Sequence, residues 1–265
     1  MLLKKLSEHG EPLGVRDLAR ENGYSASTTQ KVLNALSAHG LVQQDPETQR
    51  YALGLELFRI GVSVLHQMDI HQIARPALEQ LVHDTQESAY LALLTQDQLR
   101  CVYIDKLDCG HLLRWTADPG VWRPLNCTAD GKAILACLPA SHLRYLNEHE
   151  AFHRLTERSH LDAASLQQDL AQIPARGYAY SDEEFAEGVR SLAVPIFDYT
   201  NTIKGSVSIS GPKSRMDDGR IAVLGQAVHR AGRAISKAWG SNLLNGFYGQ
   251  NASSGDNVGR GSTTS

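Results

Sequence analysis

A run of short polar side chains near the N-terminus has the composition of a surface that hydrogen-bonds to another molecule. Hydroxyl and amide groups both donate and accept hydrogen bonds, and a lysine adds one positive charge. On DNA, glutamine can pair with an adenine edge, and lysine can contact a guanine or a phosphate. Helices that bind nothing also carry such faces, so the neighbouring elements must decide its role. The candidate contact residues are Ser25, Ser27, Thr28, Thr29, Gln30 and Lys31.

This stretch is predicted to form a helix over residues 25–40. Its apolar residues recur at helical spacing and are expected to face a small core. Ser25 or Ser27 can cap the first turn, because a hydroxyl oxygen accepts from amides that lack helical partners. Gly40 suits the left-handed residue that follows many helices. The positions expected to face the core are Val32, Leu33, Ala35 and Leu36.

The flanking residues predict a winged helix-turn-helix over residues 1–53. Two short helices are expected over 2–9 and 15–22, and a glycine-containing turn leads into the third helix. Residues 41–53 predict a hairpin, because an Asp-Pro-Glu-Thr turn separates two apolar runs. In this arrangement the third helix enters the major groove of DNA, and Arg50 in the hairpin can reach a phosphate. The first helix spans only about two turns, so we expect its beginning to be missing.

The bulk composition restricts how such a unit would bind DNA. The chain has 265 residues and a net charge of −3, which suits two ordinary domains without an overall basic field. Acidic side chains balance the basic ones within residues 1–60, so binding would need a local surface and a dimer. The cysteines form no Cys-x-x-Cys pair, and no apolar run is long enough to span a membrane. A reduced, cytoplasmic compartment is the simplest expectation.

Three further segments are predicted after the hairpin. Residues 54–70 form a linker helix so apolar that it must pack, against either a second subunit or its own C-terminal domain. Residues 71–240 predict an α+β domain with an antiparallel sheet, and residues 241–265 a disordered tail. Helices are expected over residues 71–83, 129–137, 141–147, 161–173 and 217–239. Strands are expected over residues 89–94, 99–106, 112–116, 177–181, 191–197 and 203–210.

Six segments in order along the chain resemble the IclR family of bacterial transcriptional regulators. The resemblance implies an N-terminal DNA-binding domain, a linker helix and a C-terminal domain similar to the GAF fold. It also implies dimers or tetramers on palindromic operators, and an effector that is a small carboxylate, a sugar acid or an aromatic acid. Residues 68–70 and 102–107 are most similar to the branch that governs sugar-acid and ketogluconate catabolism. The six segments are residues 24–29, 49–54, 127–136, 176–184, 188–196 and 206–212.

The resemblance also implies where the effector binds. The backbone amides of Ala129 and Asp130 match a family site at a helix N-terminus, where unpaired amides favour an anion. Many relatives have a small or apolar residue in place of Asp130, whose carboxylate would repel an anion unless it points away or pairs with Lys132. The family often has an acid where this chain has Ser181. The polar side chains that match pocket positions are Ser181, Ser191, Ser208 and Ser210.

Four more residues before this segment are candidates for the same pocket. Trp115 and Trp122 could stack on a sugar or an aromatic ring, although packing in a core is the more frequent role of tryptophan. Either Arg114 or Arg123 could pair with a carboxylate through two parallel hydrogen bonds.

Other functional classes are less consistent with the sequence. It lacks the nucleophile-elbow, phosphate-loop, dinucleotide and zinc-protease motifs, so neither an enzyme nor a cofactor is predicted. The eleven histidines have no tight ligand spacing, so no metal site is expected. Glu183 and Glu184 are adjacent on a predicted strand or its end and should point apart. The remaining alternative is a ligand-binding or dimerisation module with a degenerate DNA-binding head.

Overall fold

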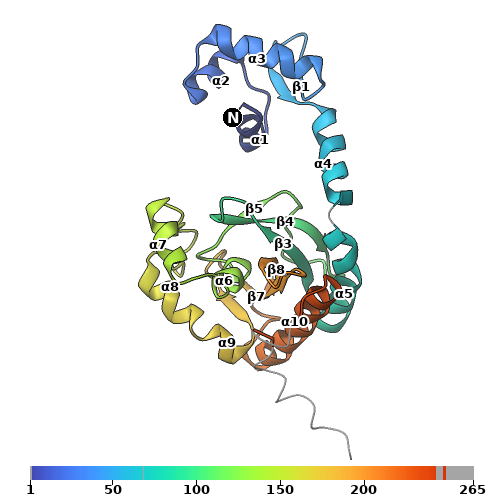
Figure 1. Cartoon of the computed structure of the whole chain (residues 1–265), viewed down its shortest axis with the longest axis vertical. Helices are drawn as coiled ribbons and strands as arrows, with labels where there is room; N and C mark the ends of the chain where they lie inside the picture. The colour runs from blue at the N-terminus through green and yellow to red at the C-terminus, as the bar shows by residue number, and fades with distance from the viewer. Residues whose placement is uncertain (1, 68, 243–246, 249–265) are drawn as a thin grey trace, which may run out of the picture. The chain divides into compact units, whose positions relative to one another are not determined.

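The computed structural model describes residues 2–67, 69–242 and 247–248. The chain divides into two compact units, Met1–Asp69 and Ile70–Ser265. Figure 1 shows a small first unit made mainly of helices, and a larger second unit in which helices surround a sheet. Among the described residues, no helix is both long and apolar enough to cross a membrane.

The first unit is a winged helix-turn-helix, as the sequence predicts. The strands of its hairpin are antiparallel, with Val42 opposite Leu53 and Gln44 opposite Tyr51. Its elements are α1 (Leu2–His9), α2 (Val15–Asn22), α3 (Ala26–Ala38), β1 (Val42–Gln44), β2 (Tyr51–Leu53) and α4 (Leu55–Gln67). Its core contains the buried side chains of Leu2, Leu6, Leu18, Leu33, Val42 and Tyr51.

Local chemistry sets the turn between α2 and α3. Gly23 ends α2 in the left-handed conformation, with φ of 68°, and its amide bonds back to the helix. Ser25 caps α3, because its hydroxyl accepts a hydrogen bond of 3.1 Å from the Thr28 amide. Leu33 is fully buried, but Val32 is 42% exposed. The predictions that Val32 and Ala35 face the core are therefore wrong, because both are exposed, and Thr29 lies inside instead.

The second unit has the predicted α+β class. Its strands form one antiparallel sheet in the order β5-β4-β3-β8-β7-β6. The strands are β3 (Ser88–Leu94), β4 (Arg100–Leu107), β5 (Trp122–Pro124), β6 (Ala179–Asp182), β7 (Val189–Phe197) and β8 (Ile203–Pro212). The helices are α5 (Asp69–Thr85), α6 (Ala129–Leu135), α7 (Ser141–Glu148), α8 (Ala163–Leu170), α9 (Ile173–Arg176) and α10 (Asp218–Ala238).

Helices cover both faces of this sheet. Ala193 of β7 joins the core cluster that contains α6 residues, whereas its neighbour Val194 faces Gly232 of α10. Successive strand residues point to opposite faces, so α6 and α10 lie on opposite sides. The helix α6 comes very close to the preceding backbone, since a Cβ on Gly131 would lie 2.2 Å from the Leu125 Cα. Only glycine permits that approach.

Two details differ from the predicted elements. Residues 112–116 form no strand; the short strand that pairs with Arg100–Val102 is β5, ten residues further on. Most of the predicted tail lies outside the described residues, but Tyr248 is buried and its hydroxyl donates to the Pro195 carbonyl. A disordered tail from residue 241 is therefore wrong at this position, because an aromatic side chain there completes the packing near α10.

Candidate DNA-binding and effector sites

The N-terminal half of α3 exposes part of the predicted contact set. The side chains of Ser27, Thr28 and Lys31 are exposed. Lys31 has no ion-pair partner among the described residues, so its charge is available to a phosphate or a guanine. Ser25 is also exposed, but its hydroxyl already serves the cap and lies 2.9 Å from the Thr28 hydroxyl. Leu33 anchors the opposite side of the helix in the core.

Two members of the predicted set are less available. Thr29 is fully buried and its hydroxyl has no hydrogen-bond partner, so it cannot contact DNA in this structure. This corrects the sequence prediction for Thr29, which followed from its polarity alone. Gln30 is half-buried, and its amide nitrogen donates to Asn34 Oδ1 at 2.7 Å and to the Tyr51 hydroxyl at 2.8 Å. These bonds tie α3 to the hairpin and include Asn34, which the candidate set omitted.

The hairpin carries the remaining candidate. Arg50 is exposed, and its guanidinium donates to the Pro12 carbonyl at 3.3 Å.

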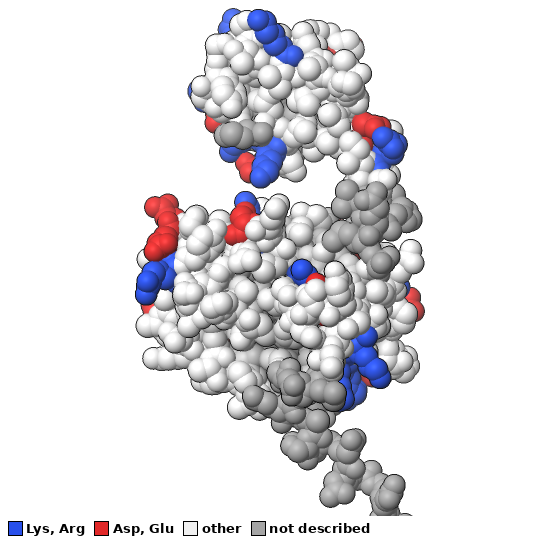
Figure 2. All heavy atoms as spheres, in the orientation of Figure 1, with Lys and Arg blue, Asp and Glu red and all other residues white. Residues whose placement is uncertain are grey.

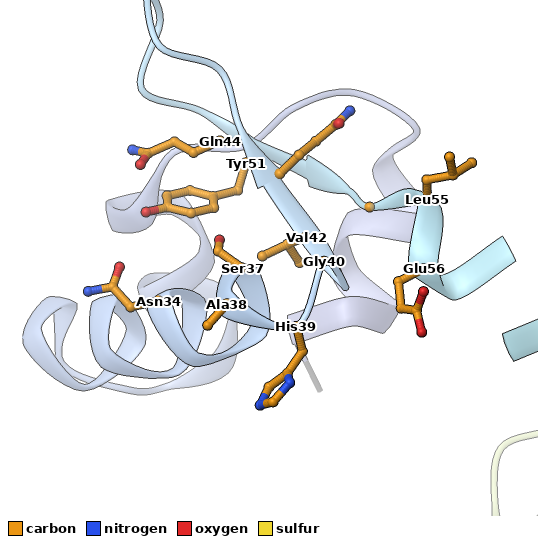
Figure 3. A pocket seen from close by; sticks show the side chains of 12 residues that line it. Asn34, Ser37, Ala38, His39, Gly40, Val42, Gln44, Tyr51, Leu55 and Glu56 are labelled. Atoms are coloured by element: carbon orange, nitrogen blue, oxygen red, sulfur yellow. The ribbon is translucent and has the colours of Figure 1, made fainter. Parts of the chain in front are cut away.

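The first unit also has a shallow groove of about 760 Å³. It lies between the C-terminal half of α3, β1 and the start of α4. Figure 3 shows Asn34, Gln44 and Tyr51 at one end of it, and Glu56 and Leu55 at the other. The groove is thus separate from the exposed positions of the first turns of α3.

Charge on the first unit is dispersed. Figure 2 shows Lys and Arg scattered among uncharged atoms on the face that it draws. Several basic side chains are paired within the unit, including Lys5 with Glu8, Arg20 with Asp17 and Arg59 with Glu56. A duplex on this unit would therefore depend on a few contacts rather than on a broad field.

In the second unit, a buried carboxylate lies at the centre of the predicted effector site. Asp130 on α6 is 1% exposed. Its oxygens accept hydrogen bonds from Ser206 at 2.8 Å, Ser208 at 3.1 Å and Tyr103 at 3.0 Å. Burial raises the pKa of this carboxyl above its ordinary value, although the three hydroxyls and nearby Arg123 oppose that effect. Asp130 does point into the sheet rather than away from it.

Lys132 does not neutralise Asp130. Its ammonium is fully buried and contacts Asp169 at 2.5 Å and Glu184 at 2.6 Å. His160 lies 3.7 Å from Glu184, and together with the two acids it has the composition of a metal site. The lysine already supplies a cation to both carboxylates there. Glu183 instead pairs with Lys213, so the two adjacent glutamates do point apart.

The predicted pocket serines lie on the face of the sheet that α6 covers. Ser181, Ser191 and Ser210 are register neighbours across β6, β7 and β8. Ser191 and Ser210 hydrogen-bond to each other at 2.8 Å, and Ser181 is buried beside them. Ser208 belongs to the same face of β8 as Ser210, two residues away, and serves Asp130. The structure brings these serines together, but their hydroxyls are largely engaged within the protein.

A cation between aromatic rings borders the same cluster. The Arg123 guanidinium lies 4.7 Å from the Phe185 ring centroid and 5.2 Å from that of Tyr103. Trp115 meets Phe185 edge to face at 5.6 Å, and its carbonyl accepts from Tyr90. Phe185 was not among the sequence candidates, because nothing in its local pattern marks it. It follows Glu184 directly, and only the fold places it over Arg123.

Helix-turn-helix geometry together with a separate α+β unit that contains a buried polar cluster is typical of a DNA-binding regulator with a ligand-binding domain. Comparison with known families agrees with that class. Residues 1–46 match the IclR helix-turn-helix domain, and residues 62–237 match the bacterial transcriptional regulator IclR C-terminal domain. The chain belongs to the IclR family of bacterial transcriptional regulators. Members bind DNA operators through the first domain and small effectors through the second.

Individual relatives cover nearly the whole chain. The transcriptional repressor IclR of Escherichia coli is 33% identical over 239 residues, which are 90% of this chain and 87% of that protein. The regulator KdgR of the same organism is 32% identical over 90% of each chain. The crystal structure of Thermotoga maritima IclR is 28% identical, covers 91% of this chain and 96% of that one, and has a TM-score of 0.65. The relatives named here are transcriptional regulators, and the chain is a regulator rather than an enzyme.

Proposed function

We propose that α3 reads an operator through Ser27, Thr28 and Lys31, with Arg50 contacting the neighbouring backbone. The exposure of these groups on a helix anchored by Leu33 is the observation that carries the proposal. Ser25 contributes mainly by capping the helix, and Gln30 by bonding to the hairpin. Thr29 has no part in the contact.

The proposed effector is a small organic acid that binds beside α6 in the second unit. The supporting observation is the guanidinium of Arg123, which lies over the rings of Tyr103 and Phe185 and borders the buried polar cluster around Asp130. Ser181, Ser191, Ser208 and Ser210, the amides of Ala129 and Asp130, and Trp115 remain the proposed lining. Such an effector changes operator affinity only if it binds two states of the protein unequally.

Self-association completes the proposal. On α4, Leu55 is 80% exposed, Phe58 is 70% exposed and Ile60 is 42% exposed. Such an apolar surface suits an interface with a second copy, and a dimer or tetramer would double the few contacts that one unit offers. A regulator of this kind would act in the cytoplasm, where the chromosome is. Light scattering during gel filtration tests this part, and a monomer at micromolar concentration would contradict it.

The test of the whole proposal is a fluorescence-anisotropy titration of the full chain against the DNA upstream of its own gene. We expect salt-sensitive binding that is tighter than binding to a shuffled duplex of equal length. Adding small organic acids should change that affinity for at least one of them. Equal affinity for the two duplexes would contradict the proposal.

A further inference from the structure

Four of the five serine hydroxyls beside α6 have partners inside the protein, and Ser181 is the exception among the described residues. Ser206 and Ser208 donate to the Asp130 carboxylate, and Ser191 bonds to Ser210. Asp130 therefore takes the donors that would otherwise receive an acidic ligand. A second carboxylate placed on the same serines would lie beside the buried Asp130 carboxylate, and like charges in a buried site repel each other strongly unless a cation compensates them. An acid must then be held by another group.

Arg123 is the group that is free to do so. No carboxylate of the described residues lies within the 4.0 Å ion-pair distance of it, and among those residues its guanidinium donates a hydrogen bond only to the Trp122 carbonyl, at 3.3 Å. The guanidinium lies over the rings of Phe185 and Tyr103, and these contacts restrict its position. A guanidinium held against aromatic rings can still donate two parallel hydrogen bonds to a carboxylate.

The neighbouring arginine is a weaker candidate. Arg114 has a carboxylate partner, since its Nε lies 3.7 Å from Asp108, and its guanidinium also donates to the His111 carbonyl. A ligand acid would have to compete with both. From the sequence alone, Arg114 and Arg123 are equally good candidates to bind a carboxylate. Their partners in the structure favour Arg123.

We propose that Arg123 is the anchor for the effector's carboxylate, and that the effector carries an aromatic or apolar body rather than the hydroxyls of a sugar acid. This inference rests on the proposed function and names the ligand class of the same site. Trp115 and Phe185, both half-buried and in edge-to-face contact, offer an apolar surface next to the anchor. A polyhydroxylated acid would find four of the five serines engaged, and it would lose more hydrogen bonds to water than it could replace.

Calorimetric titration of the full chain without DNA tests this class. Benzoate and phenylacetate are the probes, gluconate is the polyhydroxylated comparison, and benzyl alcohol lacks the charge. We expect at least one aromatic acid to bind more tightly than gluconate and benzyl alcohol. Arg123→Gln should weaken that binding by about tenfold or more, the usual effect of losing a hydrogen bond between charged groups. Arg114→Gln is the matched control and should change it less than about twofold.

Arg123→Lys is the second variant, because it keeps the charge and loses only the planar pair of donors. We expect it to bind the aromatic acid more weakly than the wild type, and circular dichroism will show whether each variant is folded. The inference is overturned if neither aromatic acid binds, if gluconate binds more tightly, or if both Arg123 variants retain wild-type affinity. Titration of the ligand-free wild type with operator DNA distinguishes a failure of this inference from a failure of the proposed function. If the protein binds the operator specifically but the ligand results are negative, the proposed DNA-binding function stands and only the aromatic-acid ligand class is rejected.

Discussion

The Asp130 carboxylate accepts a hydrogen bond of 3.1 Å from Ser208, which lies 78 positions further along the chain. This bond crosses from α6 to β8 and closes the polar cluster under the helix. Ser206 reaches the other carboxylate oxygen from the same strand. A buried carboxyl group thereby occupies the region where the family resemblance implies that the effector binds, and we expect it to limit which ligands that region accepts.

Ser206→Ala should destabilise the protein. The hydroxyl is fully buried and donates to a carboxylate, and loss of such a bond typically costs about 1.5–3 kcal/mol. Urea unfolding followed by circular dichroism measures the change. Ser27→Ala, at an exposed hydroxyl, is the control and should stay within about 0.5 kcal/mol. Equal stabilities for the two variants would mean that the Asp130 cluster contributes nothing to the fold.

Lys132→Met should be more severe. The substitution keeps the length of the side chain but leaves Asp169 and Glu184 without their shared cation. Removing one partner of a buried ion pair costs about 3–5 kcal/mol. Lys204→Met removes a partly exposed pair with Asp198 instead, and such pairs contribute about 1 kcal/mol or less. If urea unfolding gives the Lys204 variant the larger loss, the role assigned to Lys132 is wrong.

Ser25→Ala should loosen the proposed recognition helix. Its hydroxyl accepts from the Thr28 amide, and loss of an N-cap costs about 1 kcal/mol. Operator affinity should fall with the stability of α3, and hydrogen exchange should rise at the first turn. Ser25→Asp retains a capping oxygen and should restore the protection of those amides. Exchange rates that do not differ between the two variants would refute the capping role.

Asp182 should make stability depend on pH. Burial opposes its ionisation, but bonds from Arg190 and Lys213 outweigh burial and hold its pKa below the ordinary 3.8. A depressed folded-state pKa gives stability that is present above the unfolded value and is lost as pH falls through the folded value. The stability lost in Asp182→Asn should thus be constant between about pH 7 and 5 and shrink below about pH 4.

The control for this pH series is Glu187→Gln, at an exposed carboxyl with no ion pair among the described residues. Because this substitution breaks no ion pair among the described residues, its difference from the wild type should change less with pH than that of Asp182→Asn. Urea midpoints at each pH provide the data for both variants. A difference between wild type and Asp182→Asn that grows toward acid pH has the opposite sign to the one expected.

Local signals were sufficient to predict much of the first unit. The Ser25 cap, the glycine turn before it and the hairpin turn act over a few residues, so sequence spacing reveals them. The phase of α3 was harder. The buried row contains Thr29 and Leu33, four residues apart, whereas Val32 is exposed. The rule that apolar residues face the core places both Thr29 and Val32 on the wrong side of the helix. The rotation of α3 about its own axis is set by its packing on α1, α2 and the hairpin, which the local sequence does not specify.

The effector region was predictable in its location but not in its pairings. The resemblance identified Asp130 and the strand serines, yet their hydrogen bonds join residues 76 and 78 positions apart. Their closeness in sequence suggests Lys132 as a partner for Asp130. In the structure Asp130 and Lys132 are on the same short helix, but their side chains point to different clusters. The Lys132 ammonium donates to the carboxylate of Glu184, which is 52 positions away in the sequence. Such choices depend on sheet register, which a single sequence does not specify.

The most direct test of DNA recognition by α3 is the operator affinity of Lys31→Ala across a series of salt concentrations. Lys31 is exposed and unpaired among the described residues, so the variant should fold normally and bind more weakly. A lost phosphate contact should also reduce the slope of log affinity against log salt by about 1. Lys237→Ala, at an exposed lysine of α10, should leave both quantities unchanged. If Lys31→Ala binds with wild-type affinity and salt slope, α3 is not the surface that contacts DNA.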